Sequence, residues 1–148
     1  MTRILFVCLG NICRSPAAEG VMRTRSEARG LDVTIDSAGT GAWHKGEPPD
    51  RRMIKAAALR GYDLSHQRAR AVDDGDGYSF DWIIAMDQSN LRDLQDRALP
   101  DWTAKVRTLF PDQDVPDPYY GGQEGFERVL DLLEAGTDAL IAEIQRDA

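Results

Sequence analysis

The feature that most constrains the fold lies near the start of the chain, where residues 4–7 form an unbroken apolar run. Such a run is typical of a strand that is buried on both faces, as in a parallel sheet. Gly10 and Asn11 follow it, and both residue types accept the unusual backbone angles of a tight loop. Ser15 and Pro16 indicate the N-cap and the first residue of a helix. The N-terminal segment is therefore predicted to fold as a strand, a loop and a helix.

Strand and helix patterns alternate along the rest of the chain. We expect the first helix to end at Gly30, because glycine favours the left-handed conformation that closes a helix. Three further strands are expected, over residues 31–35, 81–86 and 106–110. Helices are expected over residues 51–60, capped by Asp50, over 89–98 and from 126 onward, whereas residues 62–80 predict no element. This order predicts one α/β domain over residues 1–148, a three-layer sandwich with a four-stranded parallel sheet and helices on both faces.

Charge and hydropathy limit the partners of the protein. The 148 residues include 18 Lys and Arg against 25 Asp and Glu, which gives a net charge of −7. An acidic chain of this kind is not expected to bind nucleic acid or anionic membranes through phosphate neutralisation. No window approaches the ~18 apolar residues of a membrane helix, and the N-terminal apolar run is too short for a signal peptide. We therefore expect a cytoplasmic protein, monomeric by default.

Positive charge and both cysteines gather at the N-terminal end. Residues 1–30 hold five Arg and two Glu, so any anion site is expected there. Cys8 and Cys13 are too few for the disulfide framework of a secreted domain. His44 and His66 lack the spacing that would complete a zinc site with them. A reactive thiol with a nearby partner is the remaining interpretation.

The loop between the first strand and the first helix carries the chemistry. Backbone N–H groups that turn inward at a helix N-terminus form a cradle for an anion the size of phosphate. Arg14 can clamp two phosphoryl oxygens with its planar guanidinium. The same positive field favours the thiolate form of Cys8, to which the Ser15 hydroxyl can donate a hydrogen bond. The spacing of these three residues suits nucleophilic attack on phosphorus.

Five segments together resemble the low-molecular-weight protein tyrosine phosphatase family. Residues 7–16, VCLGNICRSP, resemble the phosphate loop of that family. Four more segments resemble family motifs in the same order: residues 36–40 (DSAGT), 65–70 (SHQRAR), 86–91 (MDQSNL) and 117–121 (DPYYG), the last of which resembles the acid loop. These segments span essentially the whole chain, and together they are highly specific.

The resemblance implies a mechanism and a substrate. Cys8 would be the nucleophile and would form a phosphocysteine, while Arg14 would bind the phosphate and stabilise the transition state. Asp117 would protonate the departing phenolate as a general acid and then activate water as a base. The expected enzyme hydrolyses phosphotyrosine in proteins, and small aryl phosphates, with no cofactor and no metal. Its expected partners are a phosphotyrosine protein and a tyrosine kinase.

Further residues are expected to bind the substrate. They are Leu9, Gly10, Asn11, Ile12, Cys13, Trp43, Tyr119 and Tyr120. The three aromatic residues among them would form walls against which the ring of an aryl phosphate can stack. By the resemblance, Tyr119 and Tyr120 are also candidate phosphorylation sites for the kinase.

Other side chains are expected to support the loop. Asn11 is expected to have a positive φ angle and to hydrogen-bond within a network, which by the resemblance Ser37 and His66 would join. His44 is expected on the surface. If the two sulfurs approach, oxidation of Cys8 would yield a disulfide with Cys13 instead of irreversible over-oxidation.

Two related enzymes have similar loops. Thioredoxin-coupled arsenate reductases need further cysteines downstream, and this chain has none after Cys13. Protein-arginine phosphatases of the same family tend to have Thr where this chain has Ile12. The branched apolar Ile12 side chain would crowd the space near the leaving group, which favours tyrosine over arginine.

Two alternatives lie outside this chemistry. A phosphate-binding module without catalysis is disfavoured, because Cys8, Arg14 and Asp117 are all present. A magnesium site that uses Asp112 and Asp114 beside Asp117 is the other alternative, but these acids are more simply interpreted as part of a solvated loop.

Overall fold

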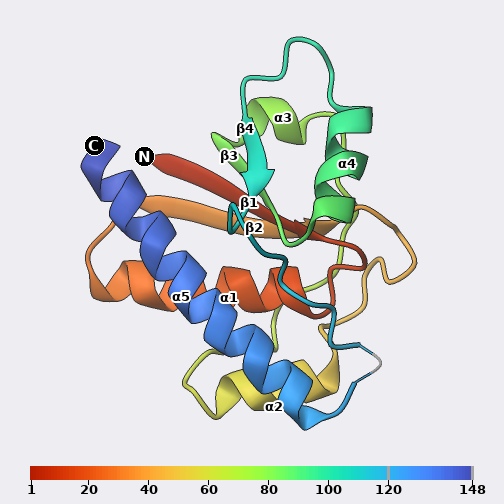
Figure 1. Ribbon diagram of the computed structural model, residues 1–148, viewed down its shortest axis with the longest axis vertical. Helices are drawn as coiled ribbons and strands as arrows, with labels where there is room; N and C mark the ends of the chain where they lie inside the picture. Colours follow the sequence, from red (N-terminus) through yellow and green to blue (C-terminus); the bar gives the residue numbers. More distant parts are fainter. Residues whose placement is uncertain (120, 148) are drawn as a thin grey trace.

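A parallel β-sheet organises the protein, whose computed structural model describes residues 1–119 and 121–147 (Figure 1). Its strands are β1 (Thr2–Cys8), β2 (Val33–Gly39), β3 (Trp82–Ala85) and β4 (Lys105–Thr108). They lie in the order β2-β1-β3-β4, and every neighbouring pair is parallel. The predicted four-stranded parallel sheet is confirmed, and the carboxyl ends of all four strands lie along one edge.

Helices cover both faces of the sheet, as predicted. They are α1 (Arg14–Ala28), α2 (Arg51–Ala58), α3 (Asp76–Ser79), α4 (Gln88–Arg97) and α5 (Gln123–Asp147). Helices α1, α2 and α5 share one apolar cluster, and α4 packs in a second cluster on the opposite face. Within the described ranges, no helix has the length and apolar character needed to cross a membrane.

The central strand β1 supplies both clusters. Ile4 and Phe6 belong to the first cluster and Leu5 and Val7 to the second, and all four side chains are fully buried. Burial on both faces explains the unbroken apolar run. Each of these side chains stabilises the fold by about 1.5–3 kcal/mol, so β1 holds its last residue, Cys8, in a fixed place.

The start of α1 differs from the prediction. The helix begins at Arg14 and its N-cap is Cys13, so the expected N-cap at Ser15 is wrong. The Ser15 hydroxyl instead accepts a hydrogen bond from Asn11 and lies against the Cys8 sulfur. Pro16 fits because N–H groups in the first turn have no intrahelical acceptor. Gly30 closes the turn after the helix, as expected, with a φ of 63°.

Strand β2 also lies later than expected. Its predicted span, residues 31–35, overlaps the turn that closes α1, where Leu31 N donates to Ser26 O. The strand therefore begins at Val33, and it continues to Gly39 because residues 36–39 pair with residues 5–8 of β1. The polar residues at its end reach the phosphate loop as a result.

The remaining boundaries shift by a few residues. Helix α2 ends two residues before the expected position, and Gly61 follows in the left-handed region with a φ of 89°. Its expected cap is confirmed, since the Asp50 carboxylate accepts a hydrogen bond from Arg52 N. Residues 62–80, where no element was predicted, contain a bridge from Ala71 to Gly39 and the short helix α3.

Candidate active site

A pocket of about 330 Å³ lies at the carboxyl ends of the strands. Ligand sites of open parallel sheets form at this edge. The lining residues are Cys8, Leu9, Gly10, Ile12, Cys13, Arg14, Trp43, His44, Asp117 and Tyr119. Cys8 comes from the end of β1, Arg14 from the start of α1 and Asp117 from the segment between β4 and α5. The fold thus brings the three residues with predicted catalytic roles to one cavity.

The phosphate loop, residues 9–13, is shaped for an anion. None of the backbone N–H groups of residues 10–15 donates a hydrogen bond within the described part of the chain. Asn11 has a φ of 57°, the positive value that the sequence predicted. A left-handed residue in such a loop turns successive N–H groups toward a common centre, where a phosphate can lie. The N-terminus of α1 adds the positive end of its dipole.

Gly39 allows β2 to approach this loop. A Cβ atom at this position would lie 2.8 Å from Leu9 O and 3.1 Å from Asn11 N, both backbone atoms that cannot move aside. Thr40 N and Gly41 N donate to Cys8 O and Leu9 O, each at 2.9 Å. The carbonyl groups are thereby held outward, on the side opposite the cradle.

A chain of buried hydrogen bonds runs from Cys8 away from the pocket. Ser15 Oγ lies 3.0 Å from Cys8 Sγ, and the Asn11 amide donates one hydrogen to Ser15 Oγ and one to Ser37 Oγ. Ser37 then donates to Glu19 Oε1 at 2.8 Å. Since the amide nitrogen of Asn11 is only a donor, Ser15 accepts from it, and its own hydrogen can point to the Cys8 sulfur at 3.0 Å or to the more distant Ala38 O at 3.4 Å.

Glu19 ends this chain and was not expected from the sequence. Its carboxylate is almost fully buried and pairs with Arg23 at 2.8 Å. Burial raises the pKa of Glu19, although the hydrogen bond from Ser37 and the charge of Arg23 oppose the shift. The sequence indicated such a role only weakly: Glu19 is a polar residue about one turn into the helix, on the face that packs inward.

The two cysteines differ in environment. Both are buried and unlinked, but only Cys8 lies within hydrogen-bond distance of Ser15 Oγ. Burial raises the pKa of Cys13 well above its usual value, and the Asp50 and Cys8 charges raise it further. Cys13 is therefore a neutral thiol, which leaves Cys8 as the sulfur suited to attack.

Arg14 is held in place at the other side of the pocket. Its Nη1 donates to Asp87 Oδ2 at 2.6 Å and to Val115 O at 3.0 Å. Burial opposes the charge, but Cys8 and Asp87 raise the pKa of Arg14, so its guanidinium stays cationic. Both hydrogens of Nη1 are used in this way, which leaves the Nε and Nη2 edge free to bind two oxygens of a phosphate.

Asp87 is a site residue that motif chemistry alone did not identify. It lies just after β3, and its carboxylate both caps α4 and accepts from Arg14. Its position in the sequence was a usable signal, because a residue that follows a central parallel strand lies at the carboxyl edge of the sheet, where ligands bind.

Asp117 lies opposite Arg14. Its Oδ2 is 3.7 Å from Arg14 Nη2, and its Oδ1 accepts a hydrogen bond from Tyr119 N at 3.0 Å. The side chain is 43 % exposed. Water and a leaving group can therefore both reach this carboxyl group.

Aromatic residues form the mouth of the pocket. Trp43, which is 71 % exposed, and Tyr119 both line it. Tyr120, expected as a third wall, lies outside the described residues. His44 was expected on the surface, but it is half-buried, lines the pocket and lies with its ring 6.3 Å from the Tyr119 ring. The Gly-rich segment around it gave no periodic pattern from which this position could be inferred.

The expected loop support is only partly found. Ser37 joins the network, but His66 is exposed and forms no hydrogen bond with Asn11 or Ser37 in the described structure. The adjacent Gln67 is buried instead and donates to Pro16 O, while Arg70 N donates to Asn11 Oδ1. Residues 65 and 66 form an exposed turn, closed by the hydrogen bond from Gln67 N to Leu64 O, so the chain returns to the interior one residue after His66.

Metal ligands do not gather at the site. The described residues contain no group of three or more His, Cys, Asp or Glu side chains with the geometry to hold a metal ion. Asp112 and Asp114 are exposed, and Asp114 accepts a hydrogen bond from Gln88 N.

Comparisons with known proteins identify relatives of this chain. The family model described as "Low molecular weight phosphotyrosine protein phosphatase" matches residues 3–148. A low molecular weight protein-tyrosine-phosphatase of Streptomyces coelicolor is 45 % identical over 97 % of this chain and 93 % of its own. The crystal structure of a protein tyrosine phosphatase from Entamoeba histolytica has a TM-score of 0.94 and 41 % identity, with 99 % of each chain covered. A Drosophila arginine phosphatase structure has a TM-score of 0.93 and 31 % identity, and both chains are fully covered.

These matches extend over nearly the full length of the chain, as did the sequence resemblance. The chain belongs to the low molecular weight phosphotyrosine protein phosphatase family, whose members are hydrolases of phosphoric monoesters.

Proposed function

We propose that the protein removes phosphate from tyrosine residues of a phosphoprotein through a phosphocysteine intermediate, and that it also hydrolyses small aryl phosphates. The observation that carries the proposal is the meeting of Cys8, Arg14 and Asp117 in one pocket beside unpaired N–H groups. A phosphoryl group in that cradle lies above the Cys8 sulfur and within reach of the free edge of Arg14. No metal ion is needed for these roles.

In the first step, the Cys8 sulfur attacks phosphorus and the bond from phosphorus to the aryl oxygen breaks. The N–H cradle and Arg14 stabilise the negative charge on the three equatorial oxygens. Asp117 transfers its proton to the aryl oxygen, so that a neutral phenol leaves. Ser15 stabilises the Cys8 thiolate before attack through its 3.0 Å contact.

In the second step, a water molecule attacks the phosphocysteine. The ionised Asp117 takes a proton from this water, the sulfur–phosphorus bond breaks, and inorganic phosphate leaves. Cys8 returns to the thiolate and Asp117 to its protonated form. The exposure of Asp117 supports this second role, because the water must reach it from solvent.

The pocket mouth supports tyrosine as the substrate. Trp43 and Tyr119 offer apolar ring surface, and the branched Ile12 side chain of the phosphate loop also lines the pocket. The similarity to an arginine phosphatase makes phosphoarginine the second candidate. An Ile12→Thr variant separates the two: it is expected to gain activity on phosphoarginine relative to phosphotyrosine, and an unchanged ratio would remove Ile12 as the basis of the choice.

Cys13 is proposed as the partner of oxidised Cys8. The loop places both thiols in the lining of one pocket, and mild peroxide is expected to yield a Cys8–Cys13 disulfide that thiols reduce. Peptide mapping by mass spectrometry tests this, and over-oxidised Cys8 with no crosslink would contradict it.

The function is tested by p-nitrophenyl phosphate hydrolysis as a function of pH in the presence of EDTA. Cys8→Ser is expected to be inactive, and Asp117→Asn is expected to lose roughly 10²–10⁴-fold, as for a missing general acid. Unchanged activity of the parent in EDTA is expected for a metal-independent reaction. An inert, folded parent protein would contradict the proposal, as would loss of activity that Mg²⁺ restores.

A further inference from the structure

Arg52 connects two loops that are far apart in the sequence. It is the second residue of α2, and its side chain is about half exposed. Its Nε donates to Asp50 Oδ1 at 3.1 Å and its Nη2 to Asp50 Oδ2 at 3.0 Å. Burial opposes ionisation of Asp50, but these hydrogen bonds lower the pKa of its carboxyl group below the usual value. The pair is therefore a two-pronged ion pair with a fixed guanidinium plane.

The opposite side of the guanidinium binds the segment that carries Asp117. Arg52 Nη2 donates to Tyr119 O at 2.7 Å, and Nη1 donates to Gly121 O at 3.3 Å. The guanidinium also lies over the Phe126 ring at 4.7 Å and the Tyr119 ring at 5.7 Å. Phe126 is a buried residue of α5, so Arg52 joins the acid loop to both helices that flank it.

Asp50 extends this connection to the phosphate loop. Its backbone N–H donates to Ile12 O at 2.7 Å, in the middle of that loop. A continuous path thus runs from Ile12 through Asp50 and Arg52 to the backbone on the far side of Asp117. This path reaches the backbone that follows Asp117, whereas Arg14 holds the backbone before it through the 3.0 Å hydrogen bond to Val115 O.

Among the described residues, few contacts reach the Asp117 side chain itself. This side chain is 43 % exposed, and its carboxylate lies 3.7 Å from Arg14 and accepts a hydrogen bond from the N–H of Tyr119. Tyr119 is the residue whose carbonyl group Arg52 holds. A general acid must lie within hydrogen-bond distance of the oxygen that it protonates, and displacement by about 1 Å can cost 10²-fold in rate.

We propose that Arg52 is a positioning residue that holds Asp117 at the leaving-group oxygen. The proposal rests on the proposed function of Asp117 as the general acid. Loss of Arg52 would therefore slow the expulsion of poor leaving groups, which require a proton, and would spare good leaving groups, which do not.

The test compares kcat/KM for phenyl phosphate and for dinitrophenyl phosphate, because this parameter covers the steps up to cleavage of the phosphorus–oxygen bond. Arg52→Ala is expected to reduce the value for phenyl phosphate by about 10- to 100-fold and the value for dinitrophenyl phosphate by less than about threefold. Arg52→Lys keeps the positive charge but not the two-pronged guanidinium, and its kcat/KM for phenyl phosphate is expected to lie between the values of Arg52→Ala and the parent. Arg51→Ala, at the exposed neighbouring position of α2, is the matched control and is expected to change neither value.

Asp117→Asn separates the two proposals. If it shows the leaving-group dependence and Arg52→Ala does not, the role of Arg52 is overturned while the proposed function stands. If Asp117→Asn shows no such dependence, Asp117 is not the acid, and both proposals fail. An equal loss for both substrates in folded Arg52→Ala, or in Arg52→Gln if the alanine variant does not fold, would indicate general disorder of the pocket and would also overturn the role.

Discussion

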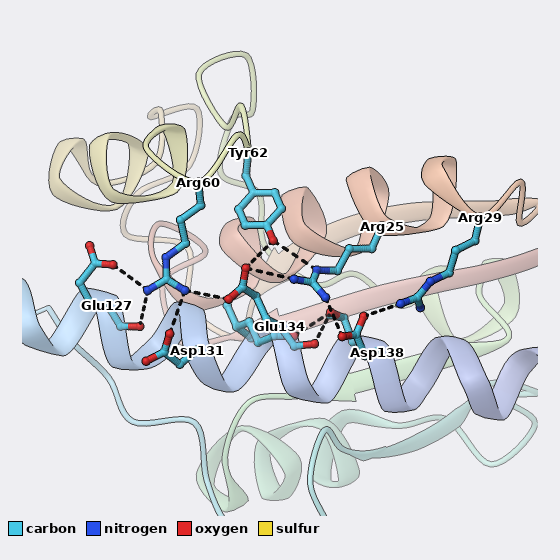
Figure 2. Close-up of polar contacts among 10 residues, drawn as sticks. Arg25, Arg29, Arg60, Tyr62, Glu127, Asp131, Glu134 and Asp138 are labelled. Atoms are coloured by element: carbon cyan, nitrogen blue, oxygen red, sulfur yellow. Dashed lines mark hydrogen bonds and ion pairs between the residues drawn. The ribbon is translucent and has the colours of Figure 1, made fainter.

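Two polar networks of the protein differ in what surrounds them. The network behind the pocket, Cys8–Ser15–Asn11–Ser37–Glu19, is buried throughout, and its donor hydrogens have assigned acceptors. The second network lies along α5 and is partly open to solvent, and in it Arg25 pairs with two acids and Arg60 with three (Figure 2). In a buried network one deletion leaves an unpaired group, whereas an exposed network can rearrange or hydrate.

The α5 network ties the C-terminal helix to the rest of the fold. Arg60, after α2, donates to Glu127, Asp131 and Glu134. From α1, Arg25 pairs with Glu134 and Asp138, and Arg29 with Asp138. Tyr62 also donates to Glu134, so one carboxylate receives contacts from three residues (Figure 2). Because its groups share several partners, the α5 network is suited to stabilising the fold. The linear chain of hydrogen bonds behind Cys8 is suited to orienting Ser15 toward the sulfur.

The largest effect is expected at Arg14, next to the buried network. Lysine in its place keeps the charge but cannot hold Asp87 and Val115 O while it presents two hydrogens to phosphate. We expect Arg14→Lys to lower kcat/KM for p-nitrophenyl phosphate by at least about 10²-fold. Steady-state kinetics measure this, with Arg60→Lys as the exposed counterpart. A loss of less than tenfold would show that charge alone suffices.

Ser37→Ala cuts the buried network without touching the pocket. It removes an acceptor from Asn11 and a donor from Glu19, so we expect a loss of about 1–3 kcal/mol in the free energy of unfolding. Activity is expected to fall about tenfold, because Ser15 loses its fixed orientation toward Cys8.

Ser26→Ala is the matched control for Ser37→Ala. Ser26 is equally buried on α1, and its hydroxyl has no partner among the described residues. Urea unfolding and kinetics should therefore show almost no change. Equal effects of the two variants would mean that the polar chain behind Cys8 has no special role.

In the partly exposed α5 network, Arg60→Ala is expected to affect stability alone. Exposed pairs contribute about 0.2–1 kcal/mol each, so we expect about 1 kcal/mol and a fall in Tm of about 3 °C. Calorimetry in dilute buffer and in 1 M salt checks this, because screening should shrink the difference. A change in kcat/KM beyond twofold would break the proposed contrast between the two networks.

The smallest effect concerns pH. Burial of Asp138 opposes its ionisation, but the hydrogen bond and charge of Arg25, with Arg29, lower its pKa below the usual value. A lowered folded-state pKa stabilises the fold above the unfolded pKa of about 3.9, and this stabilisation is lost as pH falls through the folded-state value.

The urea midpoints of parent and Asp138→Asn should therefore differ slightly near neutral pH and converge as pH falls below about 4. A difference that persists at the lowest pH would contradict the assignment to an ion pair. Midpoints that already coincide near neutral pH would show that Arg25 and Arg29 gain nothing from Asp138.

Local patterns predicted most of the fold and the chemistry of the loop. The apolar run of β1 and the glycine after α1 depend on neighbours in sequence, so they were predictable. The N-cap of α1 was not, because the Ser15 hydroxyl is taken by Asn11 and Cys8 in the folded loop.

The missed site residues share one physical cause. Glu19, Asp87 and His44 acquire their roles only when separate segments meet, and of the three only Asp87, which follows a central strand, had a position that indicated the ligand edge. The error at His66 came from a turn at residues 65 and 66 that leaves His66 exposed and makes Gln67 the buried neighbour. Long-range contacts determine which side chain of a segment points into the site. The sequence resemblance predicted only which segments lie near the site.

The most direct test of the phosphocysteine mechanism is to trap the intermediate. The parent protein would be mixed with p-nitrophenyl phosphate, stopped with denaturant during turnover, and examined by phosphorus NMR and peptide mass spectrometry. The mechanism predicts one phosphoryl group on the Cys8 sulfur and none in Cys8→Ser. Turnover by Cys8→Ser, or a phosphoryl group on another residue of the parent, would contradict it.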